Sequence, residues 1–455
     1  MNRIELTSLD LQERLHKFDE VSKGYNREMA MEEARRCLQC KKPFCVEGCP
    51  VNLNIPAFIK EILNDDLDKG LQIINENSLF PSICGRVCPQ ELQCESLCIR
   101  AKKGVPVAIG KLERYIGDNA PTPIFPEIIE NNIKVGIIGS GPSGLTCAYE
   151  LRRMGYDVTI FEGLHTPGGV LAYGIPEFRL PKNKLNDEIK KLTDIKVKII
   201  TNTIIGKTIT IEQLQKEGYQ AFYIAAGAGL PKFMDIPGEN LVGVFSANEY
   251  LTRINLMKAY LESSHTPLFP SKNVVVVGGG NVAMDAARCA IRTNVNKVYV
   301  VYRRTLEDMP ARKEEIRHAM EEGVEFIFET NPIKIHGDLD HKVLKIECVK
   351  IQLDNIDESG RKQPIPIEGS NFFIDCDTVI MALGNTPNPI ISNSLPNLNT
   401  NKNQTIIVNE NMQTSIPFVF AGGDIVTGAA TVIGAMGAGK KASISIDNYI
   451  KSLKN

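Results

Sequence analysis

Cysteines crowd the N-terminal part of the sequence, where eight of the twelve lie before Arg100. Thiolates are soft, anionic ligands that suit iron and sulfide, and short spacings let one loop supply several corners of a cluster. In proteins with two clusters, the last cysteine before a proline binds the other cluster, and both groups here contain a Cys-Pro step. The pattern therefore predicts iron–sulfur clusters held by two groups, Cys37-x2-Cys40-x4-Cys45-x3-Cys49-Pro50 and Cys84-x3-Cys88-x5-Cys94-x3-Cys98.

Two other uses of these cysteines fit the sequence less well. Structural zinc favours two separated Cys-x2-Cys pairs, and only Cys37 and Cys40 form such a pair. Disulfides need an oxidising compartment, but the opening sequence MNRIELTSLDLQERL has no apolar segment typical of a signal peptide. The least charged stretch, residues 416–439, contains Asp424 and many glycines, which argues against a membrane span. We therefore expect a cytoplasmic protein with reduced thiols.

A glycine-rich loop follows the cysteine region, within IKVGIIGSGPSGLTCAYELRRMGYDVTIFEG. A short apolar strand precedes the loop Gly139-x-Gly141-Pro142-x-Gly144, and a helix and a second strand ending at Glu162 follow it. In such a loop the first glycine permits the turn, the second admits a pyrophosphate, and the third lets the helix pack on the strand. The helix N-terminus offers free N–H groups to the phosphates. A carboxylate closing the second strand suits the ribose of a dinucleotide that has no 2′-phosphate.

The same pattern recurs later, within SKNVVVVGGGNVAMDAARCAIRTNVNKVYVVYRRT. The loop Gly278-x-Gly280-x-x-Ala283 again joins a strand to a helix, but the second strand ends in Arg303 and Arg304 instead of an acid. A 2′-phosphate prefers cationic donors, and the planar guanidinium can bind it with two hydrogen bonds. The second loop is therefore predicted to bind NADP, the alternative being a strand end that carries solvated arginines.

Three further segments indicate how the nucleotide folds close. FYIAAGAGLPKFMDIPG and TVIMALGNTPNP each show an apolar strand, then glycine, then proline, where the chain would pass between the two folds. In PFVFAGGDIVTGAATVIGAMGAGKKAS, Asp424 follows a strand and a glycine pair and opens a helix. A carboxylate at that place can bind a ribityl hydroxyl of a flavin, so the first dinucleotide is predicted to be FAD.

Length and periodicity set the domain organisation. A chain of 455 residues is too long for one core, and its net charge of −2 argues against a general nucleic-acid or membrane surface. Apolar residues at helical spacing over residues 25–38, and over 55–74 with a break near Asp65, predict a helical module around the cysteines. We predict an α/β fold with two Rossmann-like domains after this module. The boundaries are a cluster domain at 1–118, a linker at 119–132, an FAD-binding segment at 133–255, an NADPH-binding domain at 256–385 and a second FAD-binding segment at 386–455.

Taken together, six motifs resemble the small (beta) subunit family of NADPH-dependent glutamate synthase. The resemblance covers essentially the whole chain. It extends to the large subunit of NADH-dependent reduced ferredoxin:NADP oxidoreductase, to the FAD-bearing subunit of sulfide dehydrogenase and to the N-terminal part of dihydropyrimidine dehydrogenase. The motifs are CLQCKKPFCVEGCPVNLNIP, LFPSICGRVCPQELQCESLC, GPSGL, PGGVLAYGIPEFRLPK, GGGNVAMDAAR and AGGD.

The resemblance implies two [4Fe–4S] clusters, bound FAD and NADPH as substrate, with ligands that cross the two cysteine groups. Ligand softness alone would favour Cys84 where the family pattern implies an oxygen ligand, Glu113, and the sequence leaves that choice open. The implied metal ligands are Cys37, Cys40, Cys45 and Cys98 for one cluster, and Cys49, Cys88, Cys94 and Glu113 for the other. The implied FAD residues are Gly139, Gly141, Pro142, Gly144, Glu162, Gly169, Asp424, Thr431 and Val432. The implied NADPH residues are Gly278, Gly280, Asn281, Ala283, Arg303 and Arg304.

The predicted function is electron transfer from NADPH through FAD and the clusters to a larger partner. Hydride transfer between bound cofactors needs positioning but no side-chain acid or base, so we predict no catalytic residue. The sequence contains neither an amidotransferase domain with an N-terminal cysteine nor a recognisable FMN barrel. We therefore expect a hetero-oligomer whose large subunit makes glutamate from glutamine and 2-oxoglutarate, with no nucleic-acid or membrane partner.

Three alternatives stay open at this point. The partner could be a ferredoxin or flavoprotein subunit, as in an electron-bifurcating ferredoxin:NADP oxidoreductase or a sulfide dehydrogenase. A thiol–disulfide reductase would share the paired nucleotide folds, but it needs a redox Cys-x2-Cys near the NADPH domain, where Cys289 and Cys348 stand alone. The cysteine module could also be a zinc-bound docking domain on a flavoprotein.

Overall fold

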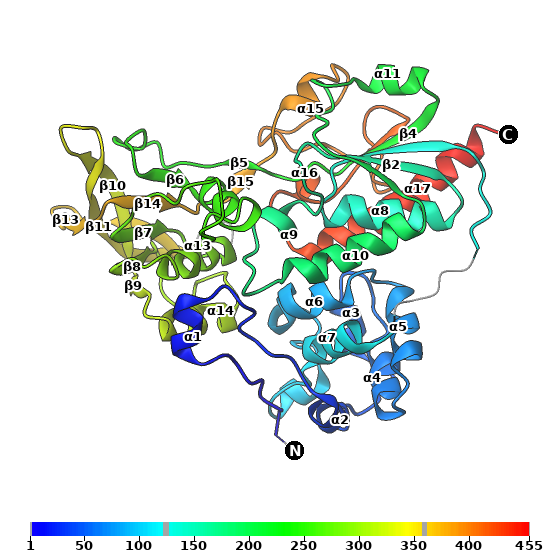
Figure 1. Cartoon of the computed structure of the whole chain (residues 1–455), viewed down its shortest axis with the longest axis horizontal. Coiled ribbons are helices and arrows are strands. Elements are labelled where there is room, and N and C mark those ends of the chain that lie inside the picture. Colours follow the sequence, from blue (N-terminus) through cyan, green and yellow to red (C-terminus); the bar gives the residue numbers. More distant parts are fainter. Residues whose placement is uncertain (1, 122–126, 357–361, 455) are drawn as a thin grey trace.

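A computed structural model describes residues 2–121, 127–356 and 362–454, which form a helical module and two α/β units (Figure 1). Each α/β unit is built on a parallel five-stranded sheet. The predicted fold class, two Rossmann-like units preceded by a helical domain, is confirmed. Within the described ranges, no helix combines the length and the hydropathy that a membrane span requires.

Short helices build the N-terminal module, and their loops carry the two cysteine groups. The predicted break near Asp65 is confirmed: this residue has a φ of 59° and separates two amphipathic helices. The first helix ends at Ala34, before the predicted limit of residue 38, because the chain turns there into the first cysteine loop. The helices are α2 (Arg27–Ala34), α3 (Phe44–Glu47), α4 (Ile55–Leu63), α5 (Leu67–Asn75), α6 (Pro81–Val87) and α7 (Ile109–Asn119), with the 3-10 turns η1 (Gln90–Leu92) and η2 (Ile99–Lys102).

The first α/β unit has the strand order β16-β4-β1-β2-β3. Its central strand is buried over almost its whole length, as expected for a parallel sheet covered on both faces. The last strand in the chain, β16, pairs with β4, so the unit is built from two separate segments. The strands are β1 (Lys134–Ile138), β2 (Asp157–Phe161), β3 (Lys198–Ile200), β4 (Tyr219–Ile224) and β16 (Val419–Ala421). The main helices are α8 (Pro142–Arg153), α10 (Lys182–Asp194) and α17 (Val432–Ser452), and the shorter ones are α9 (Val170–Tyr173), α11 (Ile211–Lys216), α15 (Ile390–Asn393) and α16 (Asp424–Thr427).

The second α/β unit has the order β6-β14-β7-β8-β9 and carries an additional antiparallel sheet of four strands. The two chain crossings between the units pair with each other as β5 and β15. The parallel strands are β6 (Val244–Ser246), β7 (Asn273–Val277), β8 (Lys297–Val301), β9 (Glu325–Ile327) and β14 (Thr378–Met381). The antiparallel strands are β10 (Thr330–Gly337), β11 (Val343–Ile356), β12 (Lys362–Pro366) and β13 (Phe372–Asp375), and the crossings are β5 (Leu230–Pro231) and β15 (Asn385–Thr386). The helices are α12 (Ala247–Leu251), α13 (Asn281–Ile291) and α14 (Lys313–Glu321), with a π-helical turn at Thr252–Leu256.

The second α/β unit begins earlier in the chain than the predicted boundary at residue 256. Strand β6 was expected in the first FAD segment, 133–255, but it pairs with β14, so the second unit begins before β6. A three-residue edge strand carries too little periodicity to reveal its partner. The predicted linker at 119–132 lies partly outside the described residues, and residues 127–132 contain neither helix nor strand.

The N-terminal arm contacts both the cluster module and the second α/β unit. On the module side, Arg3 pairs with Glu95 at 2.8 Å and the Ile4 N–H donates to the Glu33 carboxylate at 2.9 Å. The helix α1 of the arm (Leu11–His16) lies beside α14 of the second unit (Figure 1). There Arg14 pairs with Glu321 at 2.7 Å, and the Phe18 ring stacks on Tyr260 at 3.9 Å between centroids. The arm therefore connects the module to the second nucleotide unit.

Candidate functional site

Four cysteines from two distant stretches line one cavity of about 190 Å³. Cys37, Cys40 and Cys45 come from the loop around α3, and Cys98 immediately precedes η2. Two arginine side chains hold the loops together: the Arg100 Nε donates to the Arg36 carbonyl oxygen, and the Arg36 Nη2 donates to the Val105 carbonyl oxygen at 2.6 Å. The structure thus brings together all four residues expected to bind the first cluster.

The remaining candidate ligands also lie close to one another. A Cβ on Gly48 would lie 2.8 Å from the Gln93 carbonyl oxygen, so the loops that carry Cys49 and Cys94 touch. A Cβ on Gly85 would lie 2.6 Å from the Gly110 carbonyl oxygen, so α6 packs closely on α7. These two contacts bring a second group of potential ligands close to one another, namely Cys49, Cys84, Cys88, Cys94 and Glu113.

Glu113 and Cys84 differ in what their side chains contact. Burial raises the pKa of the Glu113 carboxyl to about 8, and within the described part of the chain this carboxyl has no hydrogen bond or ion pair. Burying a carboxyl without a hydrogen-bond or ionic partner costs free energy. Binding a metal would give the Glu113 carboxylate such a partner. The Cys84 thiol instead donates to the Met436 sulfur at 3.6 Å and lies 3.9 Å from the Ser78 hydroxyl oxygen. These contacts favour Glu113 as the fourth ligand, although Cys84 also lies beside Cys88.

The thiols need a positively charged centre to ionise. Burial, together with the neighbouring Cys98 and Cys37 thiols, raises the pKa of Cys45 to about 12, and burial raises that of Cys49 to about 11. Iron would supply the positive charge that deprotonates its ligands. Among the described residues, no three Cys, His, Asp or Glu side chains are spaced to hold a single metal ion. Four thiols around a cavity therefore fit a cluster better than the zinc alternative.

The predicted FAD residues converge on the N-terminus of α8. Gly139 has a φ of 101°, which favours glycine, and a Cβ on Gly141 would meet no protein atom within 4 Å. Pro142 is the first residue of the helix, and no side chain caps its free N–H groups. The open space beside Gly141 and these free N–H groups fit a pyrophosphate. A Cβ on Gly144 would lie 2.0 Å from the Gly139 carbonyl oxygen, so the helix packs tightly on the loop.

Ser140, which the sequence analysis missed, connects three parts of this site. Its backbone N–H and its hydroxyl donate to one Glu162 carboxylate oxygen at 2.8 and 2.5 Å. Its hydroxyl oxygen also accepts a hydrogen bond from the Gly168 N–H at 3.0 Å. A Cβ on the adjacent Gly169 would lie 2.9 Å from the Gly141 Cα, so this segment rests against the glycine loop. A small polar residue between the first two glycines was the only available signal.

The C-terminal segment reaches the same place. A Cβ on Gly423 would lie 3.0 Å from the Ser143 Cβ, which puts Asp424 next to the first turn of α8. The Asp424 carboxylate accepts a hydrogen bond from the Ala430 N–H at 3.2 Å, and burial raises its pKa. Thr431 caps α17 by accepting from the Gly434 N–H at 3.2 Å, and Val432 is the first residue of that helix. The structure therefore brings all the predicted FAD residues together.

Helix α17 connects the flavin loop to the cysteine module. A Cβ on Gly439 would lie 2.2 Å from the Ser143 carbonyl oxygen, so α17 packs closely on α8. Two residues earlier, a Cβ on Gly437 would lie 3.3 Å from the Pro50 carbonyl oxygen, and the adjacent Met436 contacts Cys84. One helix thus touches both the candidate flavin site and the residues beside Cys49.

The second glycine loop has the same form as the first. A Cβ on Gly280 would meet no protein atom within 4 Å, whereas one on Gly278 would lie 2.3 Å from the Ala382 carbonyl oxygen. The Asn281 side-chain oxygen accepts from the Arg312 N–H at 2.9 Å, and Ala283 is fully buried against the sheet. This open space at an uncapped helix N-terminus fits a second dinucleotide.

The two arginines after β8 are not equivalent. Arg304 is buried, and its Nε donates to the Lys362 carbonyl oxygen at 3.1 Å. Arg303 is exposed and has no hydrogen bond or ion pair to any other described residue. Recognition of a 2′-phosphate would therefore depend mainly on Arg303.

Arg303→Ala tests this assignment. We expect the KM for NADPH to rise about tenfold or more with little change for NADH, because a hydrogen bond to a charged group contributes about 1.5–3 kcal/mol. The KM values are measured with ferricyanide as acceptor. Arg317→Ala, another exposed arginine of the same unit, should change neither value. Equal losses for NADPH and NADH in Arg303→Ala would refute the assignment.

Comparison with known proteins assigns the family. Residues 14–123 match dihydropyrimidine dehydrogenase domain II, 4Fe-4S cluster, and residues 133–439 match pyridine nucleotide-disulphide oxidoreductase. The chain belongs to this oxidoreductase family. Its N-terminal part is a domain of the 4Fe-4S cluster type, and the expected resemblance to dihydropyrimidine dehydrogenase is confirmed.

Relatives over most of the chain are subunits of several enzymes. Glutamate synthase (NADPH) small chain of Azospirillum brasilense is 37% identical over 456 residues, covering 97% of this chain and 93% of that protein. NADP(+)-dependent formate dehydrogenase subunit beta of Moorella thermoacetica is 36% identical over 90% of this chain, but the match spans only 61% of that subunit. NADPH-Fe(3+) oxidoreductase subunit beta of Geobacter sulfurreducens is 35% identical over 90% of this chain and 64% of that subunit. The resemblance to the glutamate synthase small chain is confirmed.

Solved structures show the fold of the two α/β units. FprA of Mycobacterium tuberculosis in complex with NADPH has a TM-score of 0.60 at 20% identity, covering 71% of this chain and 86% of that chain. Thioredoxin reductase of Lactococcus lactis has a TM-score of 0.53 at 21% identity, covering 70% of this chain and all of that chain. The chain is therefore an oxidoreductase with paired nucleotide-binding folds and an added iron–sulfur domain.

Proposed function

We propose that this chain is the NADPH-oxidising electron-transfer subunit of a glutamate synthase, working in the cytoplasm with FAD and two [4Fe–4S] clusters. Its partner would be a large subunit that makes glutamate from glutamine and 2-oxoglutarate. The observation that carries the proposal is the position of α17, which contacts both α8 at the flavin loop and Pro50 beside the second cysteine group. The 37% identity to a glutamate synthase small chain, over nearly the whole of both proteins, supports this choice of partner.

Each group of residues would bind one cofactor. Bound FAD would exchange hydride equivalents with NADPH, and the clusters would carry single electrons. Gly141 and Gly280 would let the backbone of each loop approach a pyrophosphate, and Arg303 would select the 2′-phosphate. The cysteine loops would hold the clusters on the far side of α17 from the flavin loop. No side chain in this arrangement needs to donate or accept a proton.

A second candidate function has support from other relatives. The formate dehydrogenase and NADPH-Fe(3+) oxidoreductase subunits named above match over similar lengths of this chain. The same electron-transfer subunit could therefore serve a ferredoxin or flavoprotein partner. The thiol–disulfide reductase alternative has less support, because burial raises the pKa of both Cys348 and Cys376 to about 12. Thiols with such pKa values are poor nucleophiles at neutral pH.

Reconstitution distinguishes these functions. The holoprotein, prepared anaerobically, is mixed with a glutamate synthase large subunit, and NADPH oxidation is followed with and without glutamine and 2-oxoglutarate. We expect oxidation that requires both substrates. Reduced-ferredoxin-dependent reduction of NADP, without any glutamine-dependent activity, would instead support the second candidate.

A further inference from the structure

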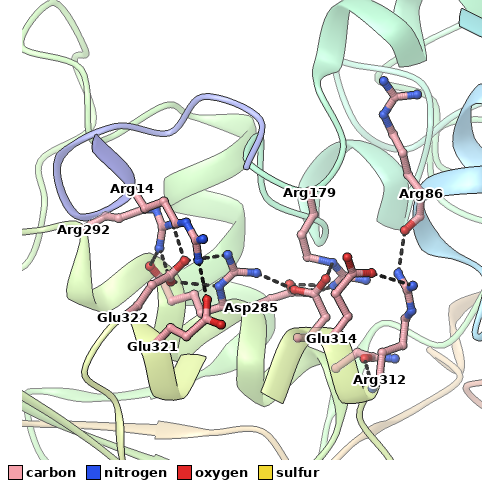
Figure 2. A network of polar contacts seen from close by, with 12 residues as sticks. Arg14, Arg86, Arg179, Asp285, Arg292, Arg312, Glu314, Glu321 and Glu322 are labelled. Atoms are coloured by element: carbon pink, nitrogen blue, oxygen red, sulfur yellow. Dashed lines mark hydrogen bonds and ion pairs between the residues drawn. The ribbon is translucent and has the colours of Figure 1, made fainter. Parts of the chain in front are cut away.

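Buried charged side chains join the two nucleotide units (Figure 2). Six of them, three arginines and three carboxylates, connect the first unit to the second. Inside the second unit, Arg288 of α13 and Arg292, directly after that helix, pair with Glu322 at 2.7 Å each, and Arg288 also pairs with Glu315 of α14 at 2.5 Å. We call this set the interunit network: Arg179, Asp285, Arg288, Arg292, Glu315 and Glu322.

Two ion pairs of this network cross from the first unit to the second, and Arg179 makes both of them. The Arg179 Nη1 donates to both Asp285 carboxylate oxygens, at 2.7 and 2.6 Å. The Arg179 Nε lies 3.4 Å from a carboxylate oxygen of Glu315. Arg179 is 8% exposed and Asp285 is 3% exposed, so water competes little for this contact. Figure 2 shows the two side chains facing each other across the boundary between the units.

Arg179 is anchored in the flavin unit. It lies in the segment between α9 and α10, and α9 directly follows Gly169 of the candidate flavin site. The Lys182 ammonium group makes that segment rigid by donating to the carbonyl oxygens of Leu171, Ile175 and Leu180 at 3.1, 2.5 and 3.0 Å. The guanidinium therefore has a fixed position relative to the flavin loop.

Asp285 is anchored in the NADPH unit. It lies on α13, the helix that follows the second glycine loop and whose N-terminus faces the space beside Gly280. A second buried polar contact also joins the two units. The Asn255 side-chain nitrogen of the second unit donates to the Tyr173 and Gly174 carbonyl oxygens of the first at 3.1 and 3.2 Å. The crossing pair thus links the two dinucleotide loops through short, rigid segments.

A buried ion pair is poorly suited to adding stability, because desolvation offsets most of the attraction. Its hydrogen bonds are directional, however, and here one guanidinium nitrogen contacts both carboxylate oxygens, which limits the orientations that keep both contacts short. Apolar side chains of similar volume would tolerate more sliding between the units. The use of an ion pair at this boundary therefore indicates selection for orientation.

We propose that Arg179 and Asp285 are positioning residues that hold the NADPH unit in the orientation in which NADPH delivers its hydride to the flavin. This inference rests on the proposed function only in that both loops must bind their dinucleotides. Hydride transfer requires the two reacting atoms at close range, and small misplacements slow it strongly.

The test measures flavin reduction by NADPH in the complete holoprotein by anaerobic rapid mixing. Asp285→Asn keeps the size of the side chain and removes its charge. We expect its limiting rate of flavin reduction to fall about tenfold or more, while the Kd for NADPH, taken from the concentration dependence of that rate, changes less than about threefold. The double variant Arg179→Met/Asp285→Leu replaces the pair by apolar side chains. It should keep near-wild-type thermal stability and show the same slow reduction.

Glu188→Gln is the matched control, because Glu188 is equally buried and its ion pair with Lys191 lies within α10 of the first unit. It should lower the melting temperature and leave the rate of flavin reduction unchanged. A wild-type rate in the stable double variant, or an equal loss of rate in Glu188→Gln, would overturn the proposal. Failure of NADPH to reduce the flavin of the wild-type protein would instead contradict the proposed function.

Discussion

Replacing Cys98 by alanine is expected to remove one cluster and leave the flavin in place. Cys98 is the only member of its sequence group that lines the first cavity, so its loss opens that site on one side. The iron content should fall from about eight to about four atoms per chain. NADPH oxidation with the partner subunit should fall about 100-fold or more, while reduction of ferricyanide by NADPH through the flavin should persist. Iron analysis and the two assays test this.

The second cluster has its own matched pair of variants. Glu113→Ala should lose about half the iron, whereas Cys84→Ala should keep nearly all of it, because Cys84 already contacts Met436. The reverse result would show that Cys84 is the fourth ligand. Full iron content in Cys98→Ala would contradict the first ligand set.

Gly141→Ala is expected to weaken FAD binding about tenfold or more without unfolding the protein. A Cβ at this position meets no protein atom within 4 Å, so the substitution fits the folded chain. The same methyl group would occupy the space predicted for the pyrophosphate. Flavin content after dialysis and the Kd for FAD added to the flavin-free protein measure the effect.

Gly280→Ala, in the other glycine loop, is the matched control, since a Cβ at that position also meets no protein atom within 4 Å. It should raise the KM for NADPH by a similar factor and leave the flavin content unchanged. Loss of flavin in Gly280→Ala, or full flavin content in Gly141→Ala, would mean that the two loops have been assigned wrongly.

Local motifs predicted the parts of the site that depend on short stretches of chain. The strand, glycine loop and helix around Gly139 are contiguous, and the turn requires glycine there because its φ is positive. The loop at Gly278 and the break near Asp65 are likewise formed by contiguous residues, and both positions have a positive φ. For these features the spacing of residues in sequence is also their spacing in the fold.

Features that depend on contacts between distant segments could not be predicted in the same way. The strand β6 joins the second sheet through pairing with β14, more than a hundred residues later. The Cys84–Met436 contact joins residues 352 positions apart. Arg303 and Arg304 look identical in sequence, but only the fold shows that one is buried and the other exposed. The position of the N-terminal arm on the second unit likewise depends on long-range contacts such as Arg14–Glu321.

We propose that one chain holds a flavin and two iron–sulfur clusters, at sites that both lie beside α17. Counting iron, acid-labile sulfide and flavin in anaerobically purified protein tests it most directly. We expect about eight iron atoms, about eight sulfide ions and about one FAD per chain. Protein that retains its flavin but contains neither iron nor labile sulfide would contradict it.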